Sequence, residues 1–225
     1  MKGNRDFGLI YHINSHFNDL KKDLNHIDTV SDFSSSKEKR RAILFDFLQI
    51  GELASQLSES FKNEFNNSNL KLLISIRNRI VHGYATIRDD IIFETLKREL
   101  TPFIKEINAF AHEYYRKKVN ELIGKKVKVL VDRPIGYKHN GLIYPINYGS
   151  IEDLMALDGE YQDAYLLGSK MPMKEATGVV TAIIQRENDI EDKLVVSLNG
   201  NNYSEQEIEQ FVSFQEKFFN HRIIK

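Results

Sequence analysis

Residues 125–131 read Lys-Lys-Val-Lys-Val-Leu-Val, and at this stretch the hydrophobic periodicity of the chain changes. Polar and apolar residues alternate here, as they do in a strand with one buried face. The long segments before it repeat their apolar residues every three to four positions, as amphipathic helices do. The change predicts an α+β protein with two domains: an all-α domain over residues 1–118 and a β-rich domain over residues 119–225.

On the N-terminal side, the sequence predicts a bundle of four or five antiparallel helices. Apolar stripes run over residues 7–27, 37–64, 70–83 and 88–118, and breaks rich in Ser, Asp and Asn separate them. Such residues favour helix ends because their side chains bond to the backbone there. Pro102 should kink the last of these helices or split it in two, because proline removes a backbone donor.

On the C-terminal side, we expect a small barrel or a strongly curved sheet, followed by one helix. The strand pattern recurs at residues 163–167, 178–185 and 193–198, and glycines and prolines lie between these segments. Residues 204–220 return to helical spacing.

Composition and charge narrow the class of protein. With 28% charged residues and a net charge of −1, the chain fits a soluble globular protein, and having no cysteine it has no disulfide framework or thiolate metal site. No apolar window approaches the length of a membrane span, and no signal-like segment follows Met1, so we expect a cytoplasmic protein without a membrane partner. Residues 1–118 carry 19 Lys and Arg against 16 Asp and Glu, while residues 119–225 carry 12 against 16. A basic half and an acidic half favour two units with different ligands.

Residues 77–84 (RNRIVHGY) form the most informative motif of the first half. On a helix, Asn78 and His82 share a face. Arg77 leans inward, so its guanidinium needs an anion, a partner subunit or a water-filled cleft. A histidine can take the proton from a 2′-hydroxyl of RNA, and an arginine can stabilise the charge that develops on the phosphate. An ordinary polar helix face would show the same spacing, so the motif alone leaves both interpretations open.

The motif and an upstream segment resemble the HEPN superfamily, specifically the HepT-like toxins. Residues 45–54 (FDFLQIGELA) are similar to the second-helix signature of that family with its Ile-Gly-Glu. Arg77-Asn78 followed by His82 and Tyr84 is similar to its Arg-Asn-x-x-x-His-x-Tyr motif.

This resemblance covers about residues 7–115 and implies a helical bundle that forms a homodimer and cuts RNA at a shared cleft. It implies that Arg77 and His82 are catalytic and that Asn78 helps to position them. It also implies that Tyr84 is the tyrosine that a minimal nucleotidyltransferase antitoxin adenylylates to silence the toxin. No cofactor is implied for this domain.

The second half contains three carboxylates in six residues, at Asp158-Gly159-Glu160-Tyr161-Gln162-Asp163. Oxygen ligands of this kind favour Mg²⁺ or Mn²⁺, which can orient a polyphosphate and activate a water molecule. A solvated acidic turn has the same composition, so the spacing leaves a metal site and a surface turn as alternatives.

Over about residues 125–220, the sequence resembles the soluble family I inorganic pyrophosphatases. Residues 144–149 (YPINYG) are similar to their Tyr-Pro-x-Asn-Tyr-Gly segment, and residues 158–163 to their metal motif, with Glu160 in place of aspartate. The resemblance implies an OB-like β-barrel with a C-terminal helix. It implies a magnesium or manganese site whose ligands are Asp132, Asp158, Glu160, Asp163 and Glu191. The implied phosphate-binding residues are Tyr148 and Lys193, and Arg133 and Lys138 are the nearby substitutes for the basic residues of the family.

The leading hypothesis is a metal-independent endoribonuclease of the toxin–antitoxin or phage-defence type, fused to a pyrophosphatase-like domain. One alternative is a magnesium-dependent inorganic pyrophosphatase or related phosphohydrolase that the helical domain dimerises. Another is a non-catalytic domain that senses a nucleotide or pyrophosphate. The intact pair of Arg77 and His82 favours the first, while Glu160 and the short segment after Pro134 count against the second.

Overall fold

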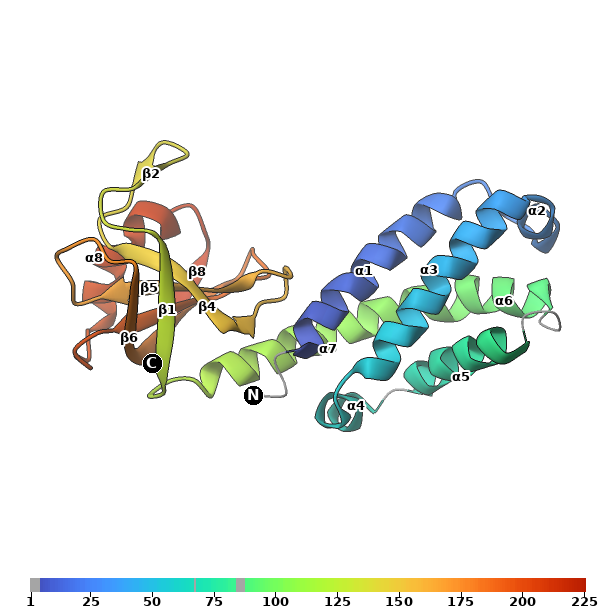
Figure 1. The fold of residues 1–225 in the computed structure, drawn as a ribbon, viewed down its shortest axis with the longest axis horizontal. Coiled ribbons are helices and arrows are strands. Elements are labelled where there is room, and N and C mark those ends of the chain that lie inside the picture. Colours follow the sequence, from blue (N-terminus) through green and yellow to red (C-terminus); the bar gives the residue numbers. More distant parts are fainter. Residues whose placement is uncertain (1–4, 67, 84–87) are drawn as a thin grey trace. The chain divides into compact units, whose positions relative to one another are not determined.

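The chain divides into two compact units, Met1–Ala111 and His112–Lys225. The computed structural model describes residues 5–66, 68–83 and 88–225. The first unit is helical and the second is a β-barrel with a helix, so the predicted α+β class is confirmed (Figure 1). The predicted domain boundary after residue 118 falls inside a helix that runs to Asn120, and it stays a prediction. In the described ranges, none of the helices has the length and hydropathy of a membrane span.

Among the described residues, eight helical segments follow one another before the first strand. Within the first unit, α1 packs along α3, and α3 packs along α5. The segments are α1 (Arg5–Asp23), α2 (Val30–Ser35), α3 (Lys37–Gln56), α4 (Glu59–Phe65), α5 (Ser68–Gly83), α6 (Asp89–Thr95), the π-helix η2 (Leu96–Leu100) and α7 (Thr101–Asn120).

The predicted helix over residues 37–64 is wrong, because the chain breaks after Gln56 and starts again as α4. Ser58 caps the new helix, its Oγ accepting a hydrogen bond of 3.2 Å from the backbone N–H of Phe61. Ser58 is itself held by the buried Asp6 carboxylate, to which it donates from its backbone N–H (2.7 Å) and its hydroxyl (2.6 Å). A cap of this kind stabilises a helix start by about 0.5–2 kcal/mol.

Helix boundaries in two further places differ from those that the hydrophobic periodicity predicted. The predicted helix over residues 88–118 is divided into α6, η2 and α7, with Pro102 in the first turn of α7, where proline is tolerated. The break before α3 contains the short helix α2, which begins with a reciprocal capping box between Thr29 and Asp32.

The core of the first unit is drawn from the apolar stripes that the sequence predicted, but not every residue of those stripes is buried. Tyr11, Leu72 and Ile91 were expected to face inward and are 43%, 37% and 49% exposed. The face of each helix that its neighbours bury is therefore narrower than the stripe of apolar residues in its sequence. The fully buried members include Phe7, Ile13, Leu20, Ile43, Phe47, Ile50, Leu73, Phe103 and Ile107.

The second unit is a closed barrel of five strands. The strand order is β1-β4-β5-β7-β6, and β6 pairs back onto β1. All pairs are antiparallel except β5 with β7. The elements are β1 (Lys126–Arg133), β2 (Lys138–His139), β3 (Leu142–Ile143), β4 (Asn147–Met155), β5 (Tyr161–Leu167), β6 (Glu175–Arg186), β7 (Lys193–Ser197), α8 (Glu205–Glu216) and β8 (His221–Ile224).

The pairing of Glu175–Val179 in β6 with β1 closes the barrel. Further along the same edge of β6, Ile183–Arg186 pairs with β8. At the crossing of β1 and β4, a Cβ on Gly149 would lie 1.8 Å from the carbonyl oxygen of Leu130, so only glycine fits there. The core that α8 covers contains Tyr144, Ile146, Tyr148, Tyr165, Leu167, Ala182, Ile184, Val195, Ile208 and Val212.

Candidate functional site

Arg77 lies on α5 directly against a glycine of α3. A Cβ on Gly51 would be 2.7 Å from the Cβ of Arg77 and 3.0 Å from its Cγ. Two carbon atoms in ordinary contact are about 3.5–4.0 Å apart, so any larger residue at position 51 would push the arginine away. Gly51 therefore sets how closely the stem of Arg77 approaches α3.

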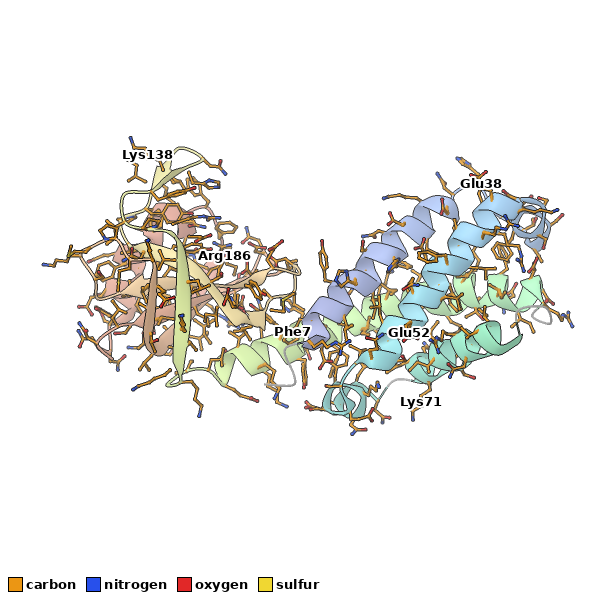
Figure 2. The ribbon with its side chains drawn as sticks, viewed as in Figure 1. Phe7, Glu38, Glu52, Lys71, Lys138 and Arg186 are labelled. Carbon is orange, nitrogen blue, oxygen red and sulfur yellow. The ribbon has the colours of Figure 1, made fainter. Side chains whose placement is uncertain are left out.

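The anion that the sequence required for Arg77 is supplied by the next residue of α3. Glu52 forms an ion pair with the Arg77 guanidinium, and Figure 2 shows Glu52 on α3. Arg77 also donates a hydrogen bond of 2.9 Å from its Nη1 to Asn78 Oδ1. The side chain of Arg77 is 25% exposed, so the guanidinium is held between partners and still reaches solvent. Since its counterion belongs to the same chain, Arg77 by itself requires no second subunit.

The remaining members of the helical motif follow at the end of α5. His82 belongs to the last turn of that helix, five residues after Arg77, which corresponds to a rise of roughly 7.5 Å along the axis. The side chain of His82 and the whole of Tyr84 lie outside the described residues. The structure therefore brings together Arg77, Asn78 and Glu52, and the roles of His82 and Tyr84 stay predictions.

In the second unit, the strand register places an acidic and a basic residue side by side. The strands β5 and β7 pair in parallel with Ala164 opposite Leu194, so Asp163 and Lys193, one position earlier on each strand, are neighbours. Lys193 Nζ lies 2.6 Å from Asp163 Oδ2 and also forms an ion pair with Glu191. The Lys193 side chain is only 4% exposed.

Two of the predicted metal ligands show perturbed proton affinity. Burial raises the pKa of Glu191 to about 7, against the lowering effect of Lys193, and Asp163 and Asp158 contribute to the rise. Partial loss of hydration, opposed by Arg133, also raises the pKa of Asp132, and the Asp163 charge adds to it. These carboxylates therefore lie within electrostatic reach of one another.

These residues, as arranged, do not fit a resident magnesium ion. Among the described residues, no three His, Asp or Glu side chains converge in a way that could hold a metal. Asp163 and Glu191 share the Lys193 ammonium, and Asp158 Oδ1 accepts a hydrogen bond of 3.0 Å from the backbone N–H of Glu160 to close the turn. The Glu160 side chain is exposed. We therefore derive no chemistry through a metal at this position.

The predicted phosphate-binding residues are mostly engaged inside the barrel. The Tyr148 hydroxyl donates to Asp163, and Lys193 is buried between its two carboxylates. Arg133 donates a hydrogen bond of 2.7 Å to the Tyr144 hydroxyl and lies over two tyrosine rings. Lys138 alone of this predicted set is exposed, on the hairpin of β2 and β3, where Figure 2 labels it.

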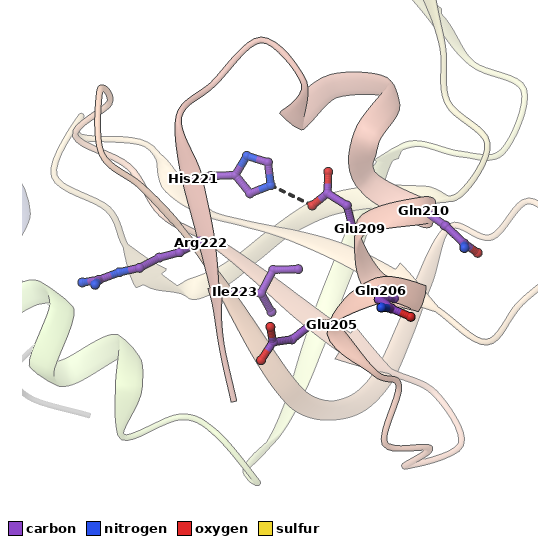
Figure 3. Close-up of a pocket in the computed structure, with 7 residues that line it drawn as sticks. All are labelled: Glu205, Gln206, Glu209, Gln210, His221, Arg222 and Ile223. Atoms are coloured by element: carbon purple, nitrogen blue, oxygen red, sulfur yellow. Dashed lines mark hydrogen bonds and ion pairs between the residues drawn. The ribbon is translucent and has the colours of Figure 1, made fainter.

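A polar pocket between α8 and β8 was not predicted from the sequence (Figure 3). His221 donates from Nε2 to Glu209 (2.9 Å), and its Nδ1 lies 3.1 Å from the carbonyl oxygen of Phe219. His221 lies on a strand of four residues that the hydrophobic pattern did not reveal. The pocket is lined by Glu205, Gln206, Glu209, Gln210, His221, Arg222 and Ile223.

A second missed feature is a buried charge network. The Arg186 guanidinium bonds to both carboxylate oxygens of Glu216, at 2.9 and 2.7 Å, and to Asp189 at 2.8 Å. The Tyr165 hydroxyl donates to the same Glu216. These partners come from β5, β6, the following loop and α8, so only the folded barrel brings them together.

Comparisons with known proteins separate the two units. Residues 13–110 match the family model described as "Ribonuclease HepT-like", which confirms the resemblance of the helical part. A curated protein of Methanocaldococcus jannaschii, named "Putative RNase MJ0127", is 28% identical over 79 residues, which cover 35% of this chain and 65% of that protein. The alignment thus spans just under two thirds of the relative.

Several solved structures that align with part of the chain are inorganic pyrophosphatases. The enzyme from Ehrlichia chaffeensis is 14% identical, with 46% of this chain and 86% of that chain covered and a TM-score of 0.39. The enzyme from Neisseria gonorrhoeae is 20% identical, with coverage of 40% and 72% and a TM-score of 0.33. The enzyme from Thermus thermophilus is 15% identical, with coverage of 45% and 81% and a TM-score of 0.35. At these TM-scores, the fold of the second unit rests on its own strand order.

Proposed function

We propose that the helical unit is an endoribonuclease that cuts RNA through the 2′-hydroxyl of the substrate. The observation that carries the proposal is the fixed guanidinium of Arg77, which Glu52 and Asn78 hold on the helix that also bears His82. The match of residues 13–110 to a ribonuclease family supports the same assignment.

The proposed roles follow from the chemistry of the side chains. His82 would accept the proton of the 2′-hydroxyl as that oxygen attacks the adjacent phosphorus. Arg77 would stabilise the negative charge that develops on the phosphate oxygens. The bond to the 5′-oxygen breaks, leaving a 2′,3′-cyclic phosphate on one fragment and a 5′-hydroxyl on the other. The nucleophile belongs to the RNA, so this reaction needs no metal-bound water.

Glu52 has two effects on Arg77 in this scheme. It fixes the guanidinium in place, which reduces the entropy lost when a phosphate binds. It also neutralises part of the positive charge, so an approaching phosphate competes with Glu52 for the same donors. Substrate binding would therefore transfer donors of Arg77 from Glu52 to the phosphate.

The cellular role is a separate part of the proposal. As a toxin of a toxin–antitoxin or phage-defence system, the protein would act as a homodimer on RNA, and a minimal nucleotidyltransferase would silence it at Tyr84. The magnesium-dependent phosphohydrolase alternative has less support, because Lys193 pairs with Asp163 and Glu191, two of the five carboxylates that were predicted to bind the ion.

The test uses the full-length protein and end-labelled single-stranded RNA in excess EDTA. We expect cleavage that leaves cyclic phosphate ends, a loss of about a hundredfold or more for His82→Ala, and a comparable loss for Arg77→Ala, about a hundredfold or more. Lys71→Ala is the matched control, because Lys71 is an exposed cation on the same helix. Absence of cleavage in both EDTA and magnesium, or equal cleavage by wild type and His82→Ala, would contradict the proposal.

A further inference from the structure

The acidic cluster of the barrel already contains a cation of its own. Lys193 opens β7, every residue of which is buried, and its ammonium lies between Asp163 on the neighbouring strand β5 and Glu191 just before β7. The parallel register of β5 and β7 fixes this contact, since Asp163 and Lys193 precede the paired residues Ala164 and Leu194. The lysine therefore occupies its place through the barrel fold itself.

The carboxylates around Lys193 are also hydrogen-bonded to other groups of the barrel. Asp163 Oδ2 accepts from both the Lys193 ammonium and the Tyr148 hydroxyl. Glu191 accepts from Lys193 through Oε2 and from the backbone N–H of Asp163 through Oε1, at 3.3 Å. These donors occupy oxygens of both carboxylates from more than one side, so the hydrogen bonds of the barrel take the place that an external ion would have.

The outer carboxylates have partners as well. Asp132 lies 3.9 Å from the guanidinium of Arg133, and Asp158 accepts the backbone N–H of Glu160 within its own turn. A magnesium ion requires six oxygen ligands in near-ideal octahedral geometry at about 2.0–2.1 Å. An ion that bound Asp163 Oδ2 and Glu191 Oε2 together would meet the Lys193 ammonium at those oxygens, and like charges at that separation repel strongly.

We propose that the Lys193 ammonium serves as the resident cation of the barrel, in the place that a divalent metal ion would take, so that the second unit holds its acidic cluster together without magnesium. The retained carboxylates then have a structural role. They neutralise a buried lysine, which would be costly without them. This inference concerns the second unit alone and is independent of the proposed ribonuclease.

The experiment measures Mn²⁺ binding and thermal unfolding on the chelator-treated full-length protein. For wild type we expect no saturable Mn²⁺ site in the micromolar range by electron paramagnetic resonance, and unfolding temperatures that are the same in EDTA and in millimolar Mg²⁺ or Mn²⁺. Lys193→Met removes the internal cation and keeps an unbranched apolar side chain that is as long as the lysine stem up to Cε. It should unfold at a lower temperature in EDTA, recover part of the loss in Mn²⁺, and bind the ion at least about tenfold more tightly than wild type. Lys170→Met, at an exposed lysine of the same unit, should behave as wild type.

A second variant keeps the test decisive if Lys193→Met does not fold. Asp163→Asn should lower the unfolding temperature and leave the weak Mn²⁺ binding of the protein unchanged. The proposal is overturned if wild type binds one Mn²⁺ at micromolar concentration and Asp163→Asn abolishes that binding. It is also overturned if wild type hydrolyses pyrophosphate in magnesium and Asp163→Asn does not, or if Lys193→Met folds and binds Mn²⁺ no more tightly than wild type.

Discussion

Gly51→Ala should lower the rate of RNA cleavage strongly while it changes the free energy of unfolding only a little. The added methyl group would lie 2.7 Å from the Cβ of Arg77, whereas carbon atoms in contact prefer about 3.5–4.0 Å. The stem of Arg77 must therefore move by roughly 1 Å relative to α3, because a Cβ is fixed to the backbone and cannot rotate away. The guanidinium moves with it and loses its alignment with Glu52.

The expected magnitudes differ for stability and for catalysis. Overpacking of this size costs about 1–3 kcal/mol of unfolding free energy, and the better helix propensity of alanine offsets about 1 kcal/mol of it. A net loss of about 0–2 kcal/mol leaves the protein folded. A misplacement of about 1 Å at a catalytic group can lower the rate by about a hundredfold. We therefore expect a folded protein with RNA cleavage reduced by about that factor.

The assay combines urea unfolding with the cleavage of labelled RNA in EDTA, and Lys71→Ala serves as the control for general damage to the bundle. The double variant Gly51→Ala with Arg77→Gly removes the clashing atoms and should be more stable than the sum of the two single changes predicts, by about 0.5–3 kcal/mol. Additive stabilities, together with full cleavage by Gly51→Ala, would refute the idea that Gly51 positions Arg77.

Two further predictions concern the barrel. Burial lowers the pKa of His221, but hydrogen bonds to Glu209 and to the Phe219 carbonyl outweigh this effect, so the pKa is raised in the folded protein. The protonated histidine should therefore stabilise the fold fully below about pH 6.5. This stabilisation should be lost as pH rises through the raised pKa of the folded state. Urea unfolding between pH 5.5 and 8.5 measures this, and a slope that His221→Gln leaves unchanged would contradict it. Glu216→Gln removes the charge that balances the buried Arg186 and should cost about 3 kcal/mol in the same assay at constant pH, while a loss below about 1 kcal/mol would contradict that estimate.

The hydrophobic periodicity predicted the helices and the change from helices to strands. It could not predict the breaks in helices that depend on residues far away in the sequence. The break after Gln56 is fixed by Asp6, which lies 52 positions before Ser58 and accepts both of its donors. A window of neighbouring residues contains no sign of that contact. In the barrel, β4 and β8 escaped prediction because β4 mixes polar with apolar positions and β8 has only four residues. Both strands are defined by their partners in the sheet.

At the candidate sites too, the sequence predicted properties of single residues, whereas their contact partners depend on the packing of distant segments. The sequence showed that Arg77 needs an anion, because the charge falls on an inward helix position, and the upstream Gly51-Glu52 pair was visible in the signature. Only the packing of α5 against α3 shows that this pair is what Arg77 contacts. For Lys193, the sequence suggested a phosphate partner, whereas the parallel register of β5 and β7 directs the ammonium to Asp163.

Arg77 in the helical unit and Lys193 in the barrel both belong to motifs that resemble known families, but the two cations differ in exposure and in how easily their partners can be replaced. In the helical unit, the residues around the motif leave the Arg77 guanidinium 25% exposed, and Glu52 is an anion that a phosphate can replace. In the barrel, the Lys193 side chain is 4% exposed, and its carboxylates accept from the barrel on more than one side, so an incoming phosphate would have to displace buried, hydrogen-bonded groups. Exchange of an ion-pair partner at a half-exposed site is far less costly than breaking a buried pair. For this reason, we propose a catalytic role for Arg77 and a structural role for Lys193.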